Sequence, residues 1–192
     1  MTEDSFYKKY IDITGLIRTE FNRNVDLYDG KILCKKGCSQ CCHQIFNITM
    51  VDANIIKSHM NSLTEEKVNL LKGKAKNYLE NFYSNKKPEE EYFSIPNQPC
   101  PALTENGECE IYEARPIICQ RFGVPVYDYK NPEKIYACVL NFKEGEEIID
   151  PELIPNQTYI GKKWDELKTE FNIEKGYNNN ASTSISEAIL NS

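Results

Sequence analysis

Half of the eight cysteines of this chain fall within nine residues, and this clustering constrains the fold more than any other feature. Residues 43–99 contain no cysteine, and a second, more widely spaced group follows them. Thiols at this density oxidise or cross-link unless something binds them, and the usual binding partner is a soft metal ion or an iron–sulfur cluster. The candidate metal ligands are therefore all eight cysteines: Cys34, Cys38, Cys41, Cys42, Cys100, Cys109, Cys119 and Cys138.

The cellular compartment decides between metal binding and disulfides. The N-terminus has no apolar leader and no stretch approaches the roughly 18 apolar residues of a membrane span, so we expect a cytoplasmic protein with reduced thiols and no membrane contact. Reduced thiols favour metal binding, and a disulfide framework stays open as the alternative because the number of cysteines is even. The net charge of −6 and the lack of a basic run argue against a nucleic acid partner. Abundant Lys and Asn with scarce Arg indicate a genome of low GC content, and we expect a bacterial source.

Apolar periodicity predicts a mainly α fold. An apolar side chain recurs about every 3.6 residues along residues 2–23 and 155–171, which predicts two amphipathic helices, the second with Trp164 in the core. Capping-box patterns at Thr49–Asp52 and Ser62–Glu65 predict the starts of two more helices. We expect residues 1–173 to form a single domain and residues 174–192, rich in Asn and Ser, to form a polar C-terminal tail that is either frayed or a weak short helix.

The region that carries the second cysteine group has little periodicity. Residues 84–98 are predicted to be a surface loop, and residues 100–138 are rich in turn-forming pairs such as Asn106-Gly107 and Asn131-Pro132. Such a segment cannot build a core of its own and is better suited to wrapping around a site. The expected architecture is a small helical scaffold with a cysteine-rich, loop-dominated metal-binding layer.

The spacing of the first cysteine group allows two local structures. On a helix, Cys34, Cys38 and Cys41 would share one face, whereas in a loop the same spacing would wrap around one metal centre. Gly37 favours the loop, because glycine lets the backbone turn tightly. We expect Cys42 to point away from Cys41, so that it serves a second metal or the core.

Two of the four arginines of the chain flank Cys119. Pro116 suits the first position of a helical turn, where backbone N–H groups favour a thiolate at Cys119. Arg115 and Arg121 would offset the negative charge that several thiolates bring to one metal, and they also suit a carboxylate or a phosphate. We therefore expect these two arginines to hold a small anionic ligand or cofactor.

The two cysteine patterns together resemble a known family. Cys-x3-Cys-x2-Cys-Cys at residues 34–42 and Cys-x-Ile-Tyr-x-x-Arg-Pro-x-x-Cys-x-Arg-Phe at residues 109–122 look like those of the YkgJ-like cysteine-cluster family, a zinc- or iron-chelating domain related to flagellin lysine N-methylases. The resemblance spans residues 34–138. It implies metal binding by the cysteines and, for most members, no known reaction. Gln120 departs from the pattern, since the family has an arginine directly after this cysteine.

Ligand spacing favours a 4Fe–4S cluster, with zinc as the alternative. Such a cluster commonly takes three thiolates close in sequence and one distant thiolate, here Cys34, Cys38 and Cys41 with one of Cys109, Cys119 or Cys138. Structural zinc sites more often pair two short Cys-x2-Cys knuckles, and eight cysteines also permit two centres. Radical S-adenosylmethionine enzymes share the first spacing, but here Gln40 replaces their usual aromatic residue and no alternation of strands and helices is predicted.

Three classes of function stay open on this basis. In the first, the centre is redox-active or serves methyl transfer, with a small anionic ligand or a protein substrate as partner. In the second, the metal is structural and the protein is an interaction module. In the third, the protein stores or delivers metal.

Overall fold

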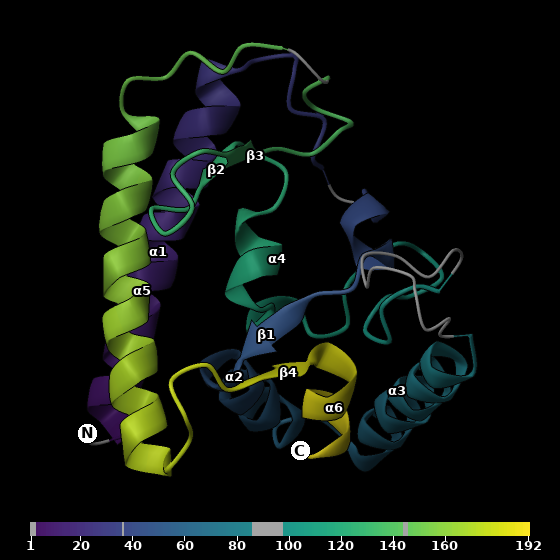
Figure 1. Ribbon diagram of the computed structural model, residues 1–192. Helices are drawn as coiled ribbons and strands as arrows, with labels where there is room; N and C mark the ends of the chain where they lie inside the picture. Colours follow the sequence, from purple (N-terminus) through teal and green to yellow (C-terminus); the bar gives the residue numbers. More distant parts are fainter. Residues whose placement is uncertain (1–2, 36, 86–97, 144–145) are drawn as a thin grey trace. The chain divides into compact units, whose positions relative to one another are not determined.

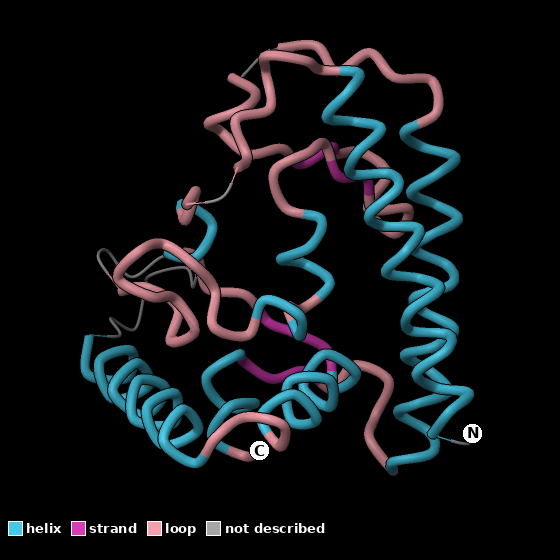
Figure 2. The backbone as a smooth tube through the Cα atoms, turned by 180° about the vertical axis from the view of Figure 1, so that it is seen from behind, coloured by secondary structure: helices cyan, strands magenta, loops and turns pink. Residues whose placement is uncertain are grey.

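The computed structural model describes residues 3–35, 37–85, 98–143 and 146–192. The described residues form six α-helices joined by loops, with four short strands (Figure 2), and 55% of the chain is helical. The mainly α fold predicted from the apolar periodicity is therefore confirmed. The chain divides into two compact units: unit 1 comprises Met1–Lys35 and Cys119–Asn179, and unit 2 comprises Lys36–Ile118 and Asn180–Ser192.

Unit 1 is built on two long helices, α1 (Glu3–Leu27) and α5 (Leu153–Lys175), which lie side by side and run in opposite directions (Figure 1). Each helix presents an apolar stripe to the other, and burial of these stripes holds the pair together. The buried residues are Phe6, Tyr10, Ile13 and Ile17 of α1 and Ile160, Trp164, Leu167 and Phe171 of α5. Both helices extend beyond their predicted bounds, and the predicted burial of Trp164 is confirmed.

A short antiparallel pair of strands completes unit 1. Strand β2 (Val126–Tyr127) pairs with β3 (Ile135–Tyr136) and packs against α5. Helix α4 (Ile117–Arg121) precedes them, and only its residues from Cys119 onward belong to unit 1.

Unit 2 packs three helices around one apolar core. Helices α2 (Met50–Met60) and α3 (Glu65–Asn85) both pack against α6 (Ile185–Leu190), and strand β1 (Asn47–Thr49) pairs antiparallel with β4 (Ser182–Ser184). The core contains Val51, Ile55, Ile56, Met60, Leu71, Ala75, Ala188 and Ile189. The predicted capping box is confirmed, since the Thr49 side chain accepts from Asp52 N and the Asp52 carboxylate accepts from Thr49 N.

Some predictions differ from the structure. Ser62 does not cap α3, which begins at Glu65, because the Ser62 hydroxyl donates to the His59 carbonyl oxygen instead. Residues 174–192 include the short helix α6, which was one of the two alternatives expected there, together with β4, and Ile189 is fully buried. Residues 86–97, which hold most of the predicted surface loop, lie outside the described residues. No described helix is both long and apolar enough to cross a membrane.

Candidate metal centre

The eight cysteines are divided between the two units, and all of them are free thiols. Unit 1 contains Cys34, Cys119 and Cys138, and unit 2 contains Cys38, Cys41, Cys42, Cys100 and Cys109.

In unit 2, the first cysteine group lies on a tight turn followed by a single 3-10 turn. Gly37 has a φ of 88°, which is open to glycine and unfavourable for other residues, and the neighbouring Cys38 is exposed. The 3-10 turn η1 (Gln40–His43) then carries Cys41 and Cys42, both half-buried. Residues 37–43 therefore form turns and not an α-helix, as the loop alternative predicted.

The Cys41 and Cys42 thiols influence each other's pKa, and the prediction that their side chains serve different directions stays a prediction. Hydrogen bonding between the two thiols is the largest influence on the pKa of each. Neighbouring Cα atoms are only about 3.8 Å apart, so two short side chains can reach one another by rotation about their Cα–Cβ bonds. This hydrogen bond lowers the pKa of Cys41 to about 7 against the opposing effect of burial, while the same bond raises the pKa of Cys42.

The second cysteine group of unit 2 lies on a loop whose ends turn back on each other. Glu110 N donates to the Ala102 carbonyl oxygen over 2.8 Å, and Thr104 N donates to the Glu108 carbonyl oxygen over 2.8 Å. These bonds place Cys100 and Cys109 at the open end of a narrow loop that has Gly107 near its tip.

Two close approaches join this loop to the first cysteine group. Cys100 N donates to the Cys42 carbonyl oxygen over 2.7 Å. At the tip, Gly107 has a φ of 76°, and a Cβ there would lie 3.1 Å from the carbonyl oxygen of Gly37. The loop of residues 100–109 is thus held against residues 37–42 at two points, and glycine is required at one of them.

We refer to Cys41, Cys42, Cys100 and Cys109 as the four-thiol cluster. Burial raises the pKa of Cys100 to about 12, and burial is also the main cause of the raised pKa of Cys109. Negative charge on Cys41 raises the pKa of each of the other three thiols. These thiols are therefore close enough for the charge of one to disfavour ionisation of the others, and a cation among them would relieve that repulsion.

Arg115 is a cation beside the cluster. Its charge lowers the pKa of both Cys41 and Cys109. The guanidinium carbon lies 3.8 Å from the centroid of the Tyr112 ring, and Nε donates to the Tyr112 carbonyl oxygen over 3.3 Å. Tyr112 lies in the 3-10 turn η2 (Tyr112–Ala114), so the segment that follows Cys109 also orients this arginine.

In unit 1, Cys34 is packed against a side chain that the sequence did not single out. Asn141 Nδ2 donates to the Cys34 sulfur over 3.4 Å and to the Gly123 carbonyl oxygen, and Asn141 Oδ1 accepts from Leu33 N over 2.9 Å. The backbone N–H of Asn141 donates to the carbonyl oxygen of Cys138, whose side chain is buried. No sequence pattern marks Asn141, because its partners are 18 and about 108 residues away.

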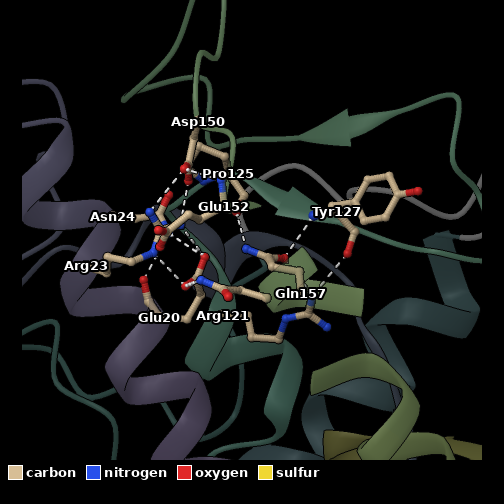
Figure 3. Close-up of polar contacts among 10 residues, drawn as sticks. Glu20, Arg23, Asn24, Arg121, Pro125, Tyr127, Asp150, Glu152 and Gln157 are labelled. Carbon is tan, nitrogen blue, oxygen red and sulfur yellow. Dashed lines mark hydrogen bonds and ion pairs between the residues drawn. The ribbon is translucent and has the colours of Figure 1, made fainter. Parts of the chain in front are cut away.

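Arg121 lies in a polar network of unit 1 (Figure 3). Its Nη2 donates to the Tyr127 carbonyl oxygen over 3.3 Å and to Gln157 Oε1 over 3.0 Å, and burial lowers the pKa of its guanidinium. Gln157 also accepts from Tyr127 N and donates to the Pro125 carbonyl oxygen. The predicted role of Arg121 in holding an anionic cofactor stays a prediction, while its bonds here join α4 to α5 and β2.

The placement of the side chains defines what the site can hold. Within the ranges that the structure describes, no three Cys, His, Asp or Glu side chains are placed so that they could hold one metal ion together. The donor chemistry of the four-thiol cluster nevertheless fits a soft metal, since thiolates select zinc and iron–sulfur clusters.

A family model described as "CxxCxxCC: Putative zinc- or iron-chelating domain" matches residues 33–138, which is more than half of the chain. The match includes all eight cysteines, Arg115 and Arg121. No curated protein and no solved structure matches the chain.

Proposed function

Because the chain belongs to the CxxCxxCC family of zinc- or iron-chelating domains, we propose that it binds its metal through the four-thiol cluster of unit 2. The observation that carries this proposal is the backbone hydrogen bond of 2.7 Å between Cys100 N and the Cys42 carbonyl oxygen. It holds together two cysteine groups that are far apart in sequence, so a metal bound by both needs little backbone rearrangement.

Metal binding by this cluster requires the thiols to lose protons and turn toward a common centre. Hydrogen bonding between the Cys41 and Cys42 thiols is lost when both sulfurs become thiolate ligands. Rotation about χ1 moves each sulfur while the backbone stays in place. The role of Arg115 is to offset the excess negative charge of four thiolates.

We favour an iron–sulfur cluster over zinc at this site. One zinc ion draws four sulfurs around a single point, whereas a 4Fe–4S cluster binds each thiolate to a different iron and therefore needs ligands that are farther apart. When bound, the centre would cross-link η1 to the loop of residues 100–109, and a cluster would add redox chemistry to this structural role.

The metal is identified by anaerobic purification, metal analysis and visible spectroscopy. An iron–sulfur centre predicts a brown protein with broad absorption near about 400 nm that dithionite bleaches. A colourless protein with tightly held zinc would exclude the iron–sulfur cluster and favour a structural zinc site instead. A chain that retains neither metal under reducing conditions would refute the proposed function.

Serine variants locate the ligands. We expect Cys41→Ser and Cys109→Ser each to lower the bound metal per chain, because a serine hydroxyl does not replace a thiolate as a soft ligand. Ser39→Ala is the matched control, since it changes the same turn at a hydroxyl that makes no capping hydrogen bond. Full metal content in both cysteine variants would exclude the four-thiol cluster as the site. Cys34, Cys38, Cys119 and Cys138 stay predicted ligands, and their serine variants test them in the same assay.

A further inference from the structure

We propose that Asp52 is a positioning residue for the metal centre, because its buried carboxylate holds the segment that carries Cys109 and Arg115. The inference rests on the proposed binding of metal by the four-thiol cluster. Asp52 is not a ligand in this proposal, and it acts through the backbone of residues 109–117.

The two carboxylate oxygens of Asp52 bind different parts of unit 2. Oδ2 accepts from Thr49 N over 3.1 Å and from Thr49 Oγ1 over 2.8 Å, which completes the capping box of α2. Oδ1 accepts from the backbone N–H of Ile117 over 2.9 Å, although Ile117 is 65 residues further along the chain. The side chain is only 3% exposed, so these hydrogen bonds replace water as the partners of a buried carboxyl group. Burial raises the pKa of Asp52, and the hydrogen bonds from Ile117 and Thr49 oppose that shift.

The segment held by Asp52 is the one that shapes the cluster. It begins at Cys109, passes through η2, and reaches Arg115 two residues before Ile117. The turn η2 packs against α2, and the buried side chains of the segment are Ile111, Ala114, Pro116 and Ile117. Apolar contacts are non-directional, whereas the hydrogen bond from Ile117 N sets one register of this segment along α2.

The carboxylate of Asp52 has one more acceptor oxygen than the start of α2 requires. A capping box needs one acceptor oxygen for the backbone of the cap residue, and Oδ2 supplies it. The second oxygen is used entirely by Ile117. An amide could keep one of these bonds, but it would turn an N–H₂ group toward a donor, either at Thr49 or at Ile117.

The test removes the capping box of α2 and the hydrogen bond from Ile117 separately and compares the effects on metal binding. Asp52→Ala removes both acceptor oxygens, and Thr49→Val weakens the capping box but leaves the bond to Ile117. Ile117→Pro removes the bond from the donor side, at a first helical position where proline is tolerated. Co(II) is the probe, because its visible bands report the number of thiolate ligands and their geometry. Its affinity is measured by chelator competition under reducing conditions. Thermal unfolding of each variant is followed in parallel.

We expect Asp52→Ala and Ile117→Pro each to weaken Co(II) binding by about 10- to 100-fold and to alter its visible bands, as loss of a group that orients ligands does. Thr49→Val should lower the melting temperature with wild-type affinity and bands. Wild-type affinity and bands in Asp52→Ala, or equal weakening in Thr49→Val, would overturn the positioning role. A wild-type chain that binds neither Co(II) nor an iron–sulfur cluster reconstituted under reducing conditions would instead overturn the proposed function, and this inference with it.

Discussion

Replacing Gly123 by alanine tests the local packing of Cys34 in unit 1. Gly123 has a φ of 117°, a conformation that side chains rarely adopt, and a Cβ at this position would lie closer than 3.0 Å to the Cys34 sulfur. The backbone strain costs about 1–3 kcal/mol, and forcing the atoms apart in a packed site costs a further ~1–3 kcal/mol. We therefore expect Gly123→Ala to lower the free energy of unfolding by roughly 2–6 kcal/mol.

The two contributions can be separated by removing the sulfur. In a Cys34→Ala background, the nearest remaining atom of this neighbour is its Cβ at 3.6 Å, which is an ordinary contact. Only the backbone strain then remains, so Gly123→Ala should cost about 1–3 kcal/mol there. The coupling between the two substitutions is thus expected to be ~1–3 kcal/mol.

Urea unfolding of all four proteins, followed by circular dichroism in reducing buffer with a chelator, measures this coupling. Gly15→Ala is the control: it lies inside α1 with no atom within 4 Å of the added Cβ, and it should stabilise the chain by about 0.5–1 kcal/mol. If Gly123→Ala costs the same in both backgrounds, within about 0.5 kcal/mol, the Cys34 sulfur does not lie where the structure places it.

Further predictions concern charge, pH and the C-terminal segment. Arg115→Gln should weaken metal binding at pH 7 by up to about tenfold, because the neighbouring thiols then hold their protons more tightly. The control Arg18→Gln, at an exposed arginine, should leave metal binding unchanged. Chelator competition measures the affinity of both variants. Backbone hydrogen bonding from Ser184 lowers the folded pKa of Glu187 below 4.5, so its stabilisation is present above pH 4.5 and is lost as the pH falls through the folded value. Glu187→Gln should therefore be less stable than the wild type at pH 7 in urea unfolding, and the difference should vanish in acid. Ile189→Ala, at a fully buried site of α6, should cost about 2–5 kcal/mol, whereas Ile173→Ala, 70% exposed, should change stability by less than about 0.5 kcal/mol in the same assay.

Local patterns in the sequence predicted the helical scaffold well. The apolar stripes of α1 and α5, the burial of Trp164 and the Thr49–Asp52 capping box follow from residues no more than about four positions apart, which is the range of helical periodicity and capping. The density of cysteines likewise pointed to metal chelation, and the family match supports it. The failure at Ser62 has a local cause, because its hydroxyl binds the end of the preceding helix rather than the start of the next.

The residues that surround the candidate site could not be deduced in this way. The tertiary structure decided that Cys42 accepts from Cys100 through the backbone, that one oxygen of Asp52 binds Ile117, and that β4 pairs with β1. These partners are about 58 to 137 residues apart, and no periodicity links them. The sequence by itself determined which thiols were available and which helices could form, whereas their meeting depended on backbone hydrogen bonds and apolar contacts that exist only once distant segments have packed together.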